Sequence, residues 1–383
     1  MVAAHVALHT GTDQNSALLH PLDIIAPYAV MVFVIISGFV ITHLLLERNE
    51  SYFQYITRRF LRIYPLYAVC LTAGVLATRL HFAAFAGHPW GNIVPQPDLV
   101  AAEQRSLAEH GYAVHILAHM TLLHGAIPNH LLEVSEYMFL GPAWSLSLEW
   151  QFYLVAPFVL WCLGSRGKAT LLALATVGAF AACRFSLRGS EFFDPSFLPA
   201  ATPYFALGIA TRLSYHRLPI LRTFPFVPLI LAGGFVIISR DLLPCLVWLC
   251  FVAWMRLQQP QDRMSAVLDH MLNAAFNSGP ARRLGRCSYS TYLIHEPLIH
   301  SIVYVCIIHW GLGMWPTFQV VALFAPAITL AASLLLYRWI EIPAIDFGKR
   351  LFTANTSLVD VPYPGLGAAA IPAALPPAKD VDG

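Results

Sequence analysis

The most informative feature of this sequence is how little charge it carries. Only 11% of its 383 residues are charged, whereas a soluble domain has about 25%. A soluble chain with 57% apolar residues and a mean hydropathy of +0.62 would expose large apolar patches and aggregate. The low charge therefore excludes a soluble enzyme and a disordered protein. The net charge of +2 is too small to suggest a nucleic-acid partner.

Paired cysteines and nucleotide-binding loops are also missing. The seven cysteines form no CxxC pair, so they predict neither a disulfide framework nor a cysteine-ligated metal. No GxxxxGK[ST] loop occurs, which leaves nucleotide hydrolysis without a site. The cysteines are typical of small apolar residues inside a bilayer; they are Cys70, Cys162, Cys183, Cys245, Cys250, Cys287 and Cys306.

The sequence contains many long apolar runs. A helix that crosses a bilayer needs about 20 apolar residues, and many stretches approach that length. Residues 1–10 resemble the second half of one further helix, so the start of the chain is expected to be missing. The sequence therefore predicts an all-α, polytopic membrane bundle of about ten helices, near residues 1–10, 24–46, 61–78, 150–164, 169–182, 198–213, 221–239, 242–255, 287–309 and 317–338.

Lysine and arginine are concentrated on alternate connections between these helices. Positively charged residues favour the cytoplasmic side of a membrane, so the pattern predicts that both termini are cytoplasmic and that residues 80–149 form a long polar outer connection. Residues 1–350 are expected to form one membrane domain. Residues 351–383, rich in Pro, Ala and Gly, are expected to be a disordered cytoplasmic tail.

Polar residues in apolar helices are candidates for function because burying them in lipid is costly. His5 and His9 lie one helical turn apart, and a neutral imidazole is a common general base; a packed core histidine is the alternative. Arg58 and Arg62 share a helix face with Arg59 beside them. Arginine binds phosphate in a bidentate manner, although these three could equally be membrane anchors.

Two further polar segments lie at helix ends. In residues 144–153, Ser145 and Glu149 share a face if the segment is helical, and Glu149 needs a partner from another helix. In residues 288–297, a polar stripe that includes Tyr292 and His295 faces the bundle interior, for packing or for substrate. His115 and His119 have the spacing of a zinc pair but lack the HExxH pattern, so no metal site is predicted.

Five short motifs follow one another along the chain, namely VIISGFVIT (34–42), RRFLRIYPLY (58–67), WSLSLEWQFYL (144–154), SYSTYLIHEP (288–297) and IEIP (340–343). In this order they resemble the acyltransferase 3 family, whose members are integral membrane O-acyltransferases of bacteria. Any one motif is weak, but the resemblance extends over residues 1 to about 350.

This resemblance implies an acyltransferase that moves an acyl group, expected to be acetyl, from cytoplasmic acyl-coenzyme A to a hydroxyl of a cell-surface glycan. Lipopolysaccharide, exopolysaccharide and nodulation factors are the family's acceptors. His5 would be the base or would carry the acyl group, with His9 as the alternative, and Glu149 would orient the imidazole. The resemblance assigns Arg58, Arg59 and Arg62 to the coenzyme A phosphates, and Trp144, Ser145, Ser147, Tyr292 and His295 to substrate contacts.

One family residue is absent. An Arg precedes the first-helix His by eleven positions in the family, and eleven positions before His5 or His9 falls outside the chain. A catalytically inactive relative is therefore one alternative, and a polytopic transporter of glycan or lipid is another. A transporter would predict inverted repeats with paired broken helices, and the sequence has no internal repeat.

Overall fold

A computed structural model describes residues 2–10, 20–48, 50–87, 97–185, 194–217, 226–239, 241–257, 267, 270, 273–274 and 278–353. Every regular element in these ranges is a helix, which confirms the all-α prediction. Within the described ranges, five helices are long and apolar enough to cross a membrane; they are Ala26–Glu47, Tyr52–Ala86, Gly141–Leu163, Ser288–His309 and Met314–Phe352. The count of ten spans stays a prediction.

The helices coincide with the apolar runs of the sequence, apart from α4, α12, α15 and the short turns. In the first half they are α1 (Val2–Thr10), α2 (His20–Glu47), α3 (Tyr52–Ala86), α4 (Pro97–Met120), the 3₁₀ turns η1 (His124–Ala126) and η2 (Gly141–Ala143), α5 (Trp144–Leu163) and α6 (Arg166–Phe185). In the second half they are η3 (Asp194–Ser196), α7 (Leu198–Arg217), α9 (Phe226–Ser239), α10 (Leu242–Leu257), α12 (Gly279–Arg286), α13 (Ser288–Tyr304), η4 (Val305–His309), α14 (Met314–Leu336), η5 (Tyr337–Glu341) and α15 (Ile342–Thr353).

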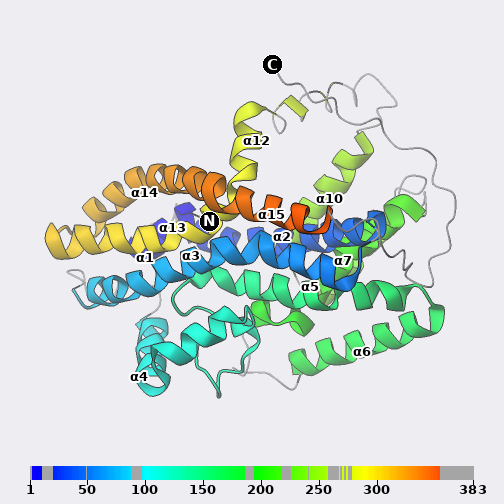
Figure 1. Ribbon diagram of the computed structural model, residues 1–383, viewed down its shortest axis with the longest axis horizontal. Helices are drawn as coiled ribbons and strands as arrows, with labels where there is room; N and C mark the ends of the chain where they lie inside the picture. The colour runs from blue at the N-terminus through cyan, green and yellow to red at the C-terminus, as the bar shows by residue number, and fades with distance from the viewer. Residues whose placement is uncertain are drawn as a thin grey trace.

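Helix α13 holds one part of the bundle together. It packs against α1, α3 and α14, while α2 packs against α5, α7 and α10. Figure 1 shows α3 running along much of the long axis of the molecule, with α4 beside one of its ends and α6 along the lower edge. Four helices that carry family-like motifs form a connected series, because α2 packs against α5, α5 against α3 and α3 against α13.

Two glycines let α2 and α7 approach closely. A Cβ on Gly208 would lie 2.1 Å from the carbonyl oxygen of Ile35, and a Cβ on Gly38 would lie 2.6 Å from that of Phe205. Small residues are common where membrane helices cross, because packing rather than water exclusion drives their association. The glycine of the first family-like motif thus has a structural role.

Helix α3 begins nine residues before the predicted position. Ser51 caps it: the Gln54 backbone N–H donates to Ser51 Oγ, and the Ser51 N–H donates to Gln54 Oε1. This reciprocal capping box is a recognised helix start, so the signal was present in the sequence. Because of this earlier start, Arg58, Arg59 and Arg62 lie inside α3 rather than at its first residues.

The long connection between residues 80 and 149 is more ordered than expected. It contains α4, which breaks at Gly111 (φ 78°), and several of its histidines are fully buried. His119 accepts or donates at both ring nitrogens, with the Tyr67 hydroxyl 2.9 Å from Nδ1 and the Ser135 carbonyl 3.1 Å from Nε2. His124 stacks on His119 with 3.9 Å between ring centroids. Buried histidines thus fasten this connection to α3.

Acidification is expected to weaken this connection through His124. Burial lowers the pKa of His124 from 6.5 to about 3, so between those values the unfolded chain binds a proton that the folded chain does not. Stability is therefore lost as the pH falls below 6.5. Because His124→Phe keeps a planar ring and removes the titration, we expect its stability relative to wild type to increase by about 2 kcal/mol from pH 8 to pH 5.

Thermal unfolding of the two proteins in detergent across this pH range measures the difference. Glu136, whose pKa is raised by burial to about 6, has the opposite pH dependence, but it is present in both proteins and cancels. A stability difference that does not change with pH would contradict the lowered pKa, because His124 would then bind a proton equally well in the folded and unfolded chains.

Candidate active site

The candidate site lies where α1 meets α13. His5 and His9 on α1 both face the carboxylate of Glu296 on α13: His5 Nδ1 is 3.7 Å and His9 Nε2 3.6 Å from Glu296 Oε1. Both distances exceed a hydrogen bond but are within ion-pair range. The side chains are largely buried, with 16%, 15% and 9% exposed respectively. An imidazole beside a buried carboxylate is the pairing found in acyl-transfer enzymes that use a general base.

The position of Glu296 is held by a turn of another segment. The Gly141 backbone N–H donates to Glu296 Oε2 at 2.6 Å. A Cβ at Gly141 would lie 2.8 Å from Glu296 Oε1, so any side chain here would displace the carboxylate. The turn η2 before α5 therefore fixes the carboxylate between α1 and α13.

His295 and Tyr292 extend this site along α13. The fully buried His295 ring meets the His5 ring edge-on with 4.8 Å between centroids. The Tyr292 hydroxyl lies 2.7 Å from Ser145 Oγ and 2.8 Å from the carbonyl oxygen of Pro142. The structure thus brings together four of the residues selected from sequence, namely His5, Ser145, Tyr292 and His295.

Glu149 occupies a neighbouring position. Ser37 Oγ donates to Glu149 Oε1 at 3.2 Å, and the Tyr153 hydroxyl donates to the same oxygen. Arg62 and Arg59 lie close enough to act on Glu149 electrostatically. The sequence analysis expected Glu149 to orient the imidazole, but the carboxylate in contact with His5 is Glu296. A catalytic role for Glu149 stays a prediction.

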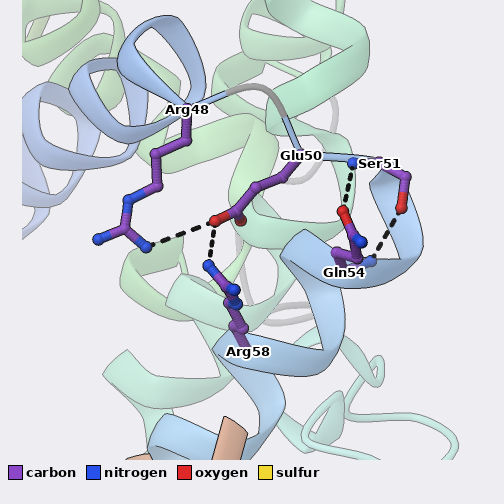
Figure 2. A network of polar contacts seen from close by, with 5 residues as sticks. All are labelled: Arg48, Glu50, Ser51, Gln54 and Arg58. Carbon is purple, nitrogen blue, oxygen red and sulfur yellow. Dashed lines mark hydrogen bonds and ion pairs between the residues drawn. The ribbon is translucent and has the colours of Figure 1, made fainter. Parts of the chain in front are cut away.

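The three predicted phosphate-binding arginines separate into two groups. Arg58 forms an ion pair with Glu50, which Arg48 also contacts, and Figure 2 shows both guanidinium groups directed at this carboxylate. Arg62 is exposed and Arg59 is half-buried. Arg62 also acts electrostatically on Glu341, which accepts a hydrogen bond from Ser290. Arg59 and Arg62 are therefore the better placed of the three to bind an anion.

The remaining predicted substrate contacts, Trp144 and Ser147, are buried in the first turn of α5. Ser147 Oγ accepts hydrogen bonds from the Gly125 N–H at 3.1 Å and from Gln151 Nε2 at 3.4 Å. Ser147 thus connects α5 to the turn η1. Its contacts are structural, and substrate binding by Ser147 and Trp144 stays a prediction.

The sequence analysis did not select three residues that the structure brings to this region. Glu296 lies within a motif, and a carboxylate in an apolar helix was itself a signal. His81 and His300 lie beside His9, with ring centroids 5.9 and 4.5 Å from it. No sequence spacing connects residues of α1, α3 and α13, so the grouping was visible only in the fold.

Comparison with known proteins agrees with the geometry. Residues 1–338 match the acyltransferase 3 family model, described as an acyltransferase domain. The chain is 25% identical to nodulation protein 10 of Rhizobium leguminosarum bv. viciae over 380 residues, which cover 92% of this chain and 90% of the relative. No solved structure matches. The chain belongs to the acyltransferase 3 family, and it is a membrane acyltransferase.

Proposed function

We propose that this protein transfers an acyl group, acetyl in the simplest case, from acyl-coenzyme A to a hydroxyl of a cell-surface glycan. The observation that carries the proposal is the His5 imidazole, which lies inside the helix bundle against the Glu296 carboxylate. A base in such a place can activate a hydroxyl while the apolar surroundings keep water from hydrolysing the thioester.

The proposed reaction uses His5 Nε2, because Nδ1 faces Glu296. Nε2 takes the proton of the acceptor hydroxyl as its oxygen attacks the thioester carbonyl. The tetrahedral intermediate then collapses, its C–S bond breaks, and the imidazolium returns the proton to the coenzyme A thiolate. Glu296 balances the transient positive charge on the imidazole, as the carboxylate of a catalytic triad does.

The arrangement of α13 supports entry of the donor from the arginine end. The Tyr289 hydroxyl donates to the carbonyl oxygen of Ile63, next to Arg62. Tyr289 and His295 are six positions apart, or about 9 Å along the helix axis. Tyr292, between them, lies within the electrostatic field of both Glu149 and Glu296. A pantetheine arm held by Arg59 and Arg62 could therefore reach His5 along this face.

Acceptor entry from the opposite end fits the same geometry. On α3, Arg62 and His81 are nineteen residues apart, or about 28 Å, which is close to the thickness of a hydrocarbon core. We place the arginine end and both termini in the cytoplasm of a bacterial cell, with the protein in the inner membrane. The Rhizobium relative is named a nodulation protein, and nodulation factors are among the acceptors that the family resemblance implies.

The function is tested with full-length protein in nanodiscs and acetyl-coenzyme A labelled in the acetyl group. We expect label to appear on an added oligosaccharide, together with one equivalent of free thiol. Thiol release without labelled sugar would contradict a glycan acceptor, and the absence of thiol release would contradict the coenzyme A donor.

Arg62 provides a specific prediction about donor binding. Because arginine contributes charge-assisted hydrogen bonds to phosphate, we expect Arg62→Ala to raise the KM for acetyl-coenzyme A by about tenfold with a smaller change in kcat. The KM for acetyl-pantetheine, which lacks the nucleotide phosphates, should not change.

Arg105→Ala is the matched control. This arginine is exposed and pairs with Glu133 in the connection beyond α3, so its loss should leave the KM of both donors at the wild-type value. If Arg62→Ala raises the KM of both donors equally, Arg62 does not bind phosphate.

A further inference from the structure

A second group of side chains lies beside the candidate active site, and the proposed reaction does not use it. His9 from α1, His81 from α3 and His300 from α13 each offer a ring nitrogen, and these nitrogens all lie within 4.8 Å of one another. The His81 and His300 rings stack at 4.1 Å, and His9 meets His300 edge-on at 4.5 Å. Three helices therefore contribute one imidazole each to a single point.

The three histidines line a small cavity. Its volume is about 30 Å³, and its other walls are apolar side chains from α3 and from α13 with the π turn η4. This space is large enough for one water molecule or one ion. His9 Nε2 and His300 Nε2 are closed off from solvent and have no hydrogen-bond partner. Buried nitrogens without a partner cost free energy. The cavity therefore presents nitrogen lone pairs that a metal ion could bind.

Two carboxylates lie next to the histidines. Glu296 Oε1 is 3.6 Å from His9 Nε2, and Glu103 Oε2 is 3.9 Å from His81 Nε2. Both carboxylates are buried. A carboxylate at the second ring nitrogen of a metal-binding imidazole orients the ring and increases its basicity. Glu103 can act on His81 in this way, whereas Glu296 lies beside the same His9 nitrogen that has no partner. Both carboxylates would also offset the charge of a divalent cation inside the bundle.

We propose that His9, His81 and His300 bind a Zn²⁺ ion. Imidazole nitrogens favour zinc over magnesium or calcium, which prefer oxygen ligands. Zn–N bonds of about 2.1 Å place the nitrogens of a tetrahedral site about 3.4 Å apart, so the stacked His81 and His300 rings must turn apart to aim their lone pairs at one ion. The ion would tie α1 to α3 and α13 and hold His5, one turn before His9, against Glu296.

The test uses full-length protein with an affinity tag that contains no histidine. The protein is stripped with a chelator, dialysed against Zn²⁺ and analysed by elemental mass spectrometry. We expect about one zinc per chain, a higher melting temperature with zinc than with chelator, and visible d–d absorption when Co²⁺ replaces Zn²⁺. Wild-type protein that retains no zinc would overturn the proposal.

Two variants keep the ring packing and remove the ligands. We expect His81→Phe and His300→Phe each to weaken zinc binding at least tenfold, while His309→Ala, which removes an exposed histidine of the following π turn, should bind as wild type does. Equal affinity in all four proteins would overturn the proposal.

If the phenylalanine variants do not fold, X-ray absorption of the wild-type zinc protein decides the question. Three imidazole ligands are the expected result, and oxygen ligands alone would refute the site. None of these measurements depends on acyl transfer. An inactive protein that binds zinc through these histidines leaves the inference intact, and an active one that binds none overturns it.

Discussion

Replacing His5 with alanine is expected to reduce kcat for acyl transfer by at least about 10³-fold, because the hydroxyl then attacks without a base. The KM for acetyl-coenzyme A should change little, since His5 lies away from the arginines. The measurement is the transfer of labelled acetyl to glycan by purified variants whose circular dichroism and gel-filtration profiles match those of wild type.

His9→Ala separates the two candidates for the base. Both imidazoles are almost equally far from Glu296 Oε1, so distance alone does not distinguish them. The surroundings do, because His5 meets His295, which lies on the face of α13 that leads to the arginines, whereas His9 meets His81 and His300. We therefore expect a smaller loss for His9→Ala, below about tenfold, since general-base loss costs far more. A larger loss of kcat for His9→Ala than for His5→Ala would identify His9 as the general base.

The second large effect is expected for Glu296→Gln. The amide keeps the shape of the side chain and can still accept the Gly141 N–H, but it no longer balances the charge on an imidazolium. We expect kcat to fall by about 10²-fold or more with the KM for the donor nearly unchanged. Glu296→Asp, which keeps the charge, should recover part of the lost rate.

Glu149→Gln is the comparison for this variant. Glu149 contacts Ser37 and Tyr153 near Arg59 and Arg62, so its neutralisation should change donor binding more than kcat. The pH dependence of kcat gives a further distinction. Only neutralisation of the carboxylate beside the imidazole should shift the pH at which the catalytic base loses its proton. If Glu149→Gln has the larger effect on kcat, the expectation drawn from the sequence is correct and Glu296 is structural.

Some of the site was predictable because its residues lie in short motifs. Tyr292 and His295 were expected to share a helix face, and Ser145 was expected at the start of a helix; the structure places all three beside or near His5. The early start of α3 was also readable, from Ser51 and Gln54. These are local properties, which depend on helical periodicity and capping within a few residues.

The partners of the charged groups were not predictable in this way. Arg58 and Arg62 are one turn apart, yet Arg58 contacts Glu50 while Arg62 is exposed near Glu149 and Glu341. Sequence spacing indicates that two side chains share a face, but it does not indicate what the opposite helix presents to each of them.

By itself, the sequence determined that this chain is an all-α membrane protein and an acyltransferase 3 relative, because low charge, apolar runs and local motifs are properties of contiguous residues. Only the tertiary structure decided that His5 faces Glu296, almost three hundred positions away, and that histidines of α1, α3 and α13 meet. The physical reason is that contacts between membrane helices depend on the rotation and depth of each helix in the packed bundle, and no periodicity along one helix specifies these for its neighbour.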